Sequence, residues 1–177
     1  DEVEAILEKM NALADEAASL DDAPDREYEA LIRPDEFTYN SLMNYYATRE
    51  NDHLSAQRAE DLLLGMSELS RRGKLRVDTT SFNIVLKAWS NSGGGINGAQ
   101  RAESILRMMI NLLGQGHENV RPDTVSYSTA ISSYSRVDPE DATAAVEKSM
   151  ELLDELEGSY ILDSDSNITS CYNAAAN

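Results

Sequence analysis

The stretch AQRAEDLLLGM at residues 56–66 returns as AQRAESILRMM at residues 99–109. In both copies the apolar residues fall at i, i+3, i+4 and i+7, the period of one buried face of a helix. Looser versions of the same helix stand at residues 3–10 (VEAILEKM) and 146–156 (VEKSMELLDEL). A helix that recurs in this way indicates a repeat protein, in which neighbouring units share their cores.

A second segment recurs ahead of these helices. It reads RPDEFTYNSLMNYYATR at 33–49, RVDTTSFNIVLKAWSNS at 76–92 and RPDTVSYSTAISSYSR at 121–136. In each copy an aspartate is followed by hydroxyl residues, an aromatic and apolar residues at helical spacing. We therefore predict a first helix in each unit, with the hydroxyl group of Thr38, Ser81 or Ser126 placed to cap its backbone N–H groups.

The two segments divide the chain into units that begin after the aspartate. Unit A is 36–78, unit B is 79–123 and unit C is 124–163, with lengths of 43, 45 and 40 residues. Residues 1–35 hold the second helix of a partial unit, which is extended and followed by an acidic insert, and residues 164–177 start a further unit. The predicted fold is all-α, a right-handed α-solenoid of antiparallel helix pairs taken from a longer array.

The net charge of −17 disfavours casual binding to nucleic acid, because like charge repels phosphate. The charge is concentrated at the ends of the chain. Residues 1–35 carry −9 and residues 124–177 carry −8, whereas residues 36–123 hold ten acidic and ten basic side chains. The charge distribution is therefore compatible with a specific nucleic-acid site in the neutral middle of the chain and with an acidic surface for a basic protein partner.

The helix pairs resemble pentatricopeptide repeats. The residues that carry the resemblance are FTYNSLMNYY, AEDLLLGM and VD in unit A, TSFNIVLKAW, AESILRMM and RPD in unit B, and VSYSTAISSY, VEKSMELLDEL and LD in unit C. The units are longer than the family's, with the extra residues in the connections. Tetratricopeptide repeats are the family nearest to pentatricopeptide repeats, but the sequence signature of their first helix is absent from this chain. The resemblance implies a protein that binds single-stranded RNA, one base per unit, and acts in RNA processing, stability or translation in a mitochondrion or plastid.

The resemblance also implies which residues contact RNA. The base-reading residues are Asn40, Asn83, Ser128 and Asn173 near the helix starts, with Asp78, Asp123 and Asp163 at the unit ends. The base-stacking residues are Phe37, Thr80 and Val125, and the phosphate contacts are Arg136 and Arg49. In the family, Asn with Asp reads uridine and Ser with Asp reads guanosine, so units A to C are expected to prefer 5′-UUG-3′. The alternative is a structural role, in which these polar residues cap helices and contact no RNA.

Other functions find less support in the residues. His53 and His117 lack ligand spacing, so no metal or cofactor is expected, and no nucleophile–base arrangement predicts a catalytic residue. The glycine-rich segment 92–98 is expected to be a flexible connector. No apolar run approaches the roughly 20 residues of a membrane helix. Two alternatives remain: an acidic scaffold for protein–protein interaction, and the RNA-binding part of a nuclease whose catalytic domain lies elsewhere in a longer chain.

Overall fold

The computed structural model describes residues 2–19 and 32–158, and these are helical with no strand among them. The predicted all-α class is confirmed. The second helix of the partial unit extends past Met10 to Ser19, as predicted, and the acidic insert falls outside the described residues. The α-helices are α1 (Glu2–Ser19), α3 (Glu36–Ala47), α4 (His53–Arg71), α5 (Thr79–Asn91), α6 (Gly95–Gly114), α7 (Thr124–Tyr134) and α8 (Ala142–Gly158), with short 3-10 helices at Glu118–Val120 and Pro139–Asp141.

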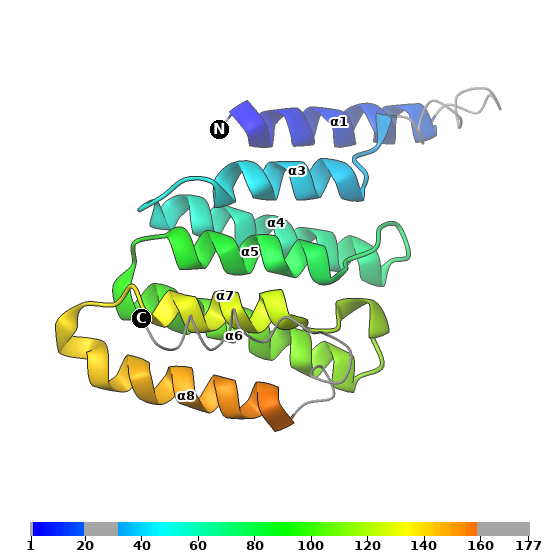
Figure 1. Cartoon of the computed structure of the whole chain (residues 1–177). Helices are drawn as coiled ribbons and strands as arrows, with labels where there is room; N and C mark the ends of the chain where they lie inside the picture. Colours follow the sequence, from blue (N-terminus) through cyan, green and yellow to red (C-terminus); the bar gives the residue numbers. More distant parts are fainter. Residues whose placement is uncertain (1, 20–31, 159–177) are drawn as a thin grey trace.

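The first helices of the three units lie side by side in one row. Helix α3 packs against α5, and α5 packs against α7, and all three run in the same direction (Figure 1). Each second helix packs beside its own first helix, and α4 and α6 also touch the first helix of the following unit. Residues that occupy the same position in each unit therefore fall into rows across α3, α5 and α7.

Aspartates cap the three first helices, where the sequence had indicated the hydroxyl groups. Each carboxylate accepts the backbone N–H three residues later at 2.8–2.9 Å. A carboxylate fits this place better than a hydroxyl group because the helix N-terminus is partly positive. The hydroxyl groups of Thr38 and Ser81 bond the same carboxylates, and the bonds from Thr38 hold the pKa of Asp35 below its ordinary value. The caps are Asp35, Asp78 and Asp123.

One continuous core joins the units. It is built from the apolar stripes that the helical spacing predicts, and the aromatic before each base-reading position belongs to it. Burial of such side chains stabilises the fold by about 1.5–3 kcal/mol each. The fully buried side chains include Met43, Leu63, Phe82, Leu86, Leu106 and Ile131.

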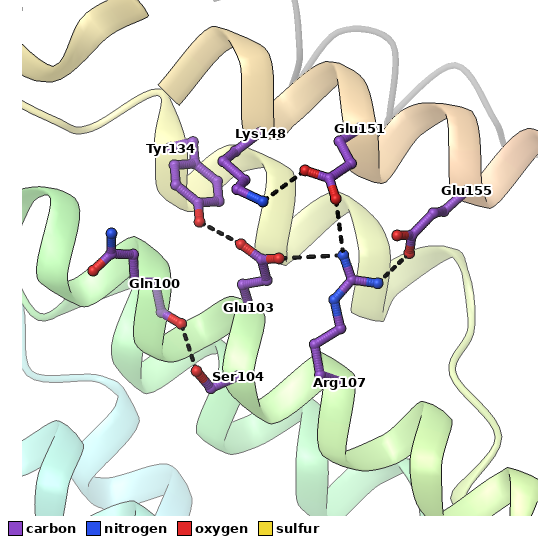
Figure 2. Close-up of polar contacts among 8 residues, drawn as sticks. All are labelled: Gln100, Glu103, Ser104, Arg107, Tyr134, Lys148, Glu151 and Glu155. Atoms are coloured by element: carbon purple, nitrogen blue, oxygen red, sulfur yellow. Dashed lines mark hydrogen bonds and ion pairs between the residues drawn. The ribbon is translucent and has the colours of Figure 1, made fainter. Parts of the chain in front are cut away.

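A glutamate on α4 and another on α6 each tie one unit to the next. Glu60 on α4 accepts the Trp89 Nε1–H at 2.8 Å and also pairs with Arg101 of α6. Glu103 stands at the matching place on α6 and accepts the Tyr134 hydroxyl at 2.5 Å (Figure 2). Burial and this bond raise the pKa of Tyr134 above its ordinary value. The same glutamate–aromatic bond thus fixes two successive junctions.

A second bond recurs at the other end of the first helices. Asn91 donates its side-chain N–H to the Ala47 carbonyl at 3.1 Å, and Arg136 donates to the Ser90 carbonyl at the same distance. Both donors lie thirteen residues after a capping aspartate, and both acceptors lie twelve residues after one. These side chains satisfy carbonyls that a helix end leaves without a partner.

The glycine-rich segment 92–98 is shorter as a connector than predicted. Helix α6 already begins at Gly95, and the Gly98 N–H bonds the Gly94 carbonyl at 3.3 Å. A side chain at Gly98 would come within 2.8 Å of the Ser92 hydroxyl, so glycine here permits close packing as well as a turn. Glycine composition suggested flexibility, but the tertiary contacts hold half of the segment as helix.

Replacing Gly93 by alanine is expected to lower the free energy of unfolding by about 1–3 kcal/mol. Gly93 has φ of +67°, and an added Cβ would lie 2.6 Å from Asn51 Oδ1 and 2.9 Å from Asn51 Cα. Urea denaturation followed by circular dichroism measures the change. The matched control is Gly114→Ala, where an added Cβ meets no atom within 4 Å, and an equal loss in both variants would contradict the prediction.

Candidate nucleic-acid interface

The predicted base-reading residues of the three units form one row. Asn40, Asn83 and Ser128 each lie five residues after a capping aspartate, just past the first turns of α3, α5 and α7. All three are partly buried and partly accessible. These helices are adjacent and run in the same direction (Figure 1), so residues at the same distance from the cap occupy matching places on neighbouring helices.

In unit B the structure brings together the two residues expected to read one base. Asn83 Nδ2 lies 3.2 Å and 3.4 Å from the two carboxylate oxygens of Asp123. Ser126, in the first turn of α7, donates its hydroxyl to Asn83 Oδ1 at 2.7 Å. A primary amide has two N–H groups and two lone pairs on oxygen. With one of each engaged, the amide keeps one donor and one acceptor for a ligand.

The hydrogen bonding of Asn40 in unit A differs from that of Asn83 in unit B. Asn40 Oδ1 is buried and has no hydrogen-bond partner among the described residues. The Asp78 carboxylate, which closes unit A, accepts the backbone N–H and the hydroxyl of Ser81 at 2.9 Å and 3.1 Å. A buried acceptor without a donor is unfavourable by about 1–3 kcal/mol. The asparagine oxygen at the reading position therefore accepts a hydrogen bond in unit B but, among the described residues, not in unit A.

Unit C presents a shorter side chain at the reading position. The Ser128 hydroxyl donates to the Val125 carbonyl at 3.2 Å, one turn back in the same helix. The residues expected to complete this unit and to open the next, Asp163 and Asn173, lie outside the described residues.

The predicted base-stacking residues lie at the surface. Phe37 is 79% exposed and Val125 is 55% exposed, and Thr80 is exposed as well. All three occupy the second position after a capping aspartate. An aromatic ring as exposed as that of Phe37 is available to stack on a flat ligand, whereas threonine offers little apolar area.

The two arginines expected to contact phosphate are engaged within the protein. Arg136 bonds the Ser90 carbonyl at 3.1 Å and Asn91 Oδ1 at 2.8 Å, so it joins α7 to the end of α5. The Arg49 guanidinium lies over the ring of Tyr45, 4.6 Å from its centroid, and also bonds the hydroxyl of that tyrosine. These contacts give both arginines a structural role at the ends of the first helices.

A row of cations at the opposite ends of these helices was not predicted. An arginine stands two residues before every capping aspartate, in RPD, RVD and RPD. The backbone at two of these positions is anchored on the first residue of the same unit: the Arg76 N–H donates to Glu36 at 2.8 Å, and the Arg121 carbonyl accepts the Thr79 hydroxyl at 2.7 Å. The recurrence is visible in the sequence, so comparing the units for charge would have found it. The arginines are Arg33, Arg76 and Arg121.

The acidic charge lies on the other set of helices. Helices α3, α5 and α7 together carry one acidic residue, Glu36, and one basic residue, Lys87. Helices α1, α4, α6 and α8 carry fourteen acidic and six basic residues. Apart from the capping aspartates, the face that bears the predicted reading row is close to neutral.

Clustered carboxylates on α6 and α8 are paired with cations. Arg107 reaches Glu103 at 3.2 Å and also pairs with Glu155, and these contacts raise the pKa of Arg107 (Figure 2). Lys148 pairs with Glu151 at 2.6 Å on α8 itself. The cluster therefore acts as an ionic junction between helices, and its carboxylates are not arranged as an isolated acid–base pair.

The described residues hold a further cavity and no gathered set of metal ligands. A cavity of about 300 Å³ lies between α4 and α6 and is lined by Leu64, Met108 and Leu112 among others. Within residues 2–19 and 32–158, no group of three or more metal-ligating side chains is gathered, and no helix is long and apolar enough to cross a membrane. Comparison with known protein families, with curated proteins and with solved structures finds no match to this chain.

Proposed function

We propose that this chain binds single-stranded RNA along the row formed by α3, α5 and α7. The observation that carries the proposal is a near-neutral face with amide and hydroxyl side chains in register, while the acidic residues gather on the second helices. A polar row next to an exposed aromatic ring is what stacking and base-edge recognition require. The helix pairs are proposed to continue as a right-handed α-solenoid, as the resemblance to pentatricopeptide repeats implies.

Each unit is proposed to contact one base. Unit B offers Asn83, whose amide can both donate to and accept from uracil, unit A offers the amide N–H groups of Asn40, whose oxygen is buried, and unit C offers the Ser128 hydroxyl. The proposed preference is 5′-UUG-3′ within a longer site. The arginines two residues before each cap are the proposed phosphate contacts in place of Arg136 and Arg49, although Arg33 and Arg121 also pair with Asp15 and Glu118. Action on mitochondrial or plastid transcripts is proposed from the family resemblance.

A second candidate function has one observation in its favour. Helix α8 carries five acidic residues and one lysine, and its Val146 and Met150 are more than half exposed. An acidic surface with apolar side chains suits a basic amphipathic partner helix. The protein would then be a scaffold, and the RNA assay below separates the two functions.

Replacing Phe37 by alanine is expected to weaken binding of 5′-AAAUUGAAA-3′ RNA by roughly 5- to 150-fold, because one stacking ring contributes about 1–3 kcal/mol. Fluorescence anisotropy at low ionic strength measures the dissociation constant with the complete 177-residue chain. The matched control is Leu54→Ala, which removes an exposed apolar side chain from α4 and should leave affinity unchanged. Equal effects of the two variants, or absence of RNA binding together with binding of a lysine-rich helical peptide, would favour the scaffold.

A further inference from the structure

Ser126 is a buried serine that connects two units at the proposed reading site. It is 0% exposed in the first turn of α7, and its hydroxyl lies 2.7 Å from Asn83 Oδ1 of α5. The same oxygen accepts the Asp123 backbone N–H at 3.1 Å and lies 2.9 Å from Asp123 Oδ1. The side chain therefore sits between the helix cap of unit C and the reading amide of unit B.

The chemistry of the three groups decides the orientation of the Asn83 amide. An ionised carboxylate only accepts hydrogen bonds, so the amide group beside Asp123 must be the NH2. The amide oxygen then faces Ser126, and the hydroxyl hydrogen serves it as donor. Rotating the amide by half a turn would place its oxygen against the carboxylate, where both groups can only accept, and would lose the hydrogen bond that the Ser126 hydroxyl donates to Oδ1.

We infer that Ser126 is a positioning residue, which together with Asp123 fixes the order of donor and acceptor that Asn83 presents to a base. Uracil and cytosine have the same size, but the atoms at positions 3 and 4 are a donor and an acceptor in uracil and the reverse in cytosine. An amide that turns freely can match either base, whereas a fixed amide matches one. Ser126 thus contributes to discrimination between pyrimidines without touching RNA. This inference rests on the proposed RNA-binding function.

Unit A provides an internal comparison. Ser81 occupies the place of Ser126 at the start of the following helix, and it bonds the capping Asp78 at 3.1 Å. The Asn40 oxygen in the same unit has no hydrogen-bond partner among the described residues. Removing the Ser81 hydroxyl therefore removes a contact to a helix cap, as removing the Ser126 hydroxyl does, but it leaves the hydrogen bonding of the Asn40 oxygen unchanged.

The test measures pyrimidine preference separately at the two units. Anisotropy titrations of the full chain use 5′-AAAUUGAAA-3′ RNA and two variants, with cytidine replacing the first uridine (unit A) or the second (unit B). For the wild-type protein, the preference for uridine should be larger at unit B. Ser126→Ala should reduce the preference at unit B by about tenfold and leave that at unit A unchanged. Ser81→Ala should change neither preference, and Ser126→Thr, which keeps the hydroxyl, should restore the wild-type ratio.

The outcomes separate the two proposals. If the wild-type chain binds none of the three RNAs, the RNA-binding function is overturned, and this inference falls with it. If the wild-type chain prefers uridine at unit B and Ser126→Ala keeps that preference, only the role of Ser126 is overturned. A uniform loss of affinity for all three RNAs with an unchanged ratio is a purely structural effect and also overturns it. Should the alanine variant fail to fold, Ser126→Cys keeps the volume with a weaker donor and is expected to lower the same ratio.

Discussion

Replacing Phe82 by alanine is expected to lower the free energy of unfolding by about 3–5 kcal/mol. Phe82 is 0% exposed on α5, the central first helix, which packs against α3, α4, α6 and α7. Truncation would remove the apolar contacts of the ring and leave a cavity that four neighbouring helices cannot close without moving. Urea denaturation followed by circular dichroism measures the loss.

Phe37 supplies the control for this experiment. The chain contains two phenylalanines, and the other one, Phe37, is 79% exposed in the first turn of α3. Phe37→Ala is expected to change the free energy of unfolding by less than about 0.5 kcal/mol. The two variants should thus have opposite profiles, since Phe82→Ala reduces stability and Phe37→Ala reduces RNA affinity. Equal losses of stability would contradict the assignment of one ring to the core and the other to the surface.

Replacing Glu60 by alanine is expected to lower the free energy of unfolding by about 2–4 kcal/mol. Glu60 is 2% exposed and accepts the Trp89 Nε1–H at 2.8 Å while it pairs with Arg101. Its removal leaves a buried indole N–H without an acceptor, which is the larger part of the loss. The Arg101 side chain is 46% exposed, so water can solvate it after the change.

Two variants separate the causes of this loss. Glu60→Gln keeps an acceptor for Trp89 and removes the charge facing Arg101, so it should be milder than the alanine variant. Glu68→Ala removes an exposed carboxylate of the same helix that pairs with Arg72 at 3.0 Å, and it should cost less than about 1 kcal/mol. If Glu60→Ala were as mild as Glu68→Ala in urea denaturation, the buried bond to Trp89 would not hold the units together.

Local features of the chain were accessible to sequence reasoning. The period of apolar residues in AQRAEDLLLGM and AQRAESILRMM located α4 and α6, because amphipathic spacing expresses which face of a helix is buried. The capping aspartates located the starts of α3, α5 and α7, although the capping role was first assigned to the hydroxyl groups. The glycine-rich composition predicted a flexible connector over 92–98, but α6 begins at Gly95 and packs on α5.

Contacts between units depended on distances that no pattern contains. Arg136 matches a phosphate-contact position in sequence, but the end of α5 lies close enough to use its guanidinium. Glu60 and Glu103 look like surface residues of amphipathic helices, yet each faces an aromatic hydrogen-bond donor from the following unit. The neutral character of the first-helix row emerges only when the charges are assigned to helices that share a face.

Asn40 and Asn83 show where the sequence stops and the tertiary structure begins. The sequence alone determined that both asparagines follow an aromatic in the first turn of a capped helix, because helix starts obey local rules of hydrogen bonding. It could not distinguish them. Only the packing of α7 on α5 brings Asp123 and Ser126 to the amide of Asn83, while no group in the described part of the chain donates to the oxygen of Asn40. Hydrogen bonds act over about 3 Å, so the exact placement of neighbouring helices decided which asparagine is held in a single orientation.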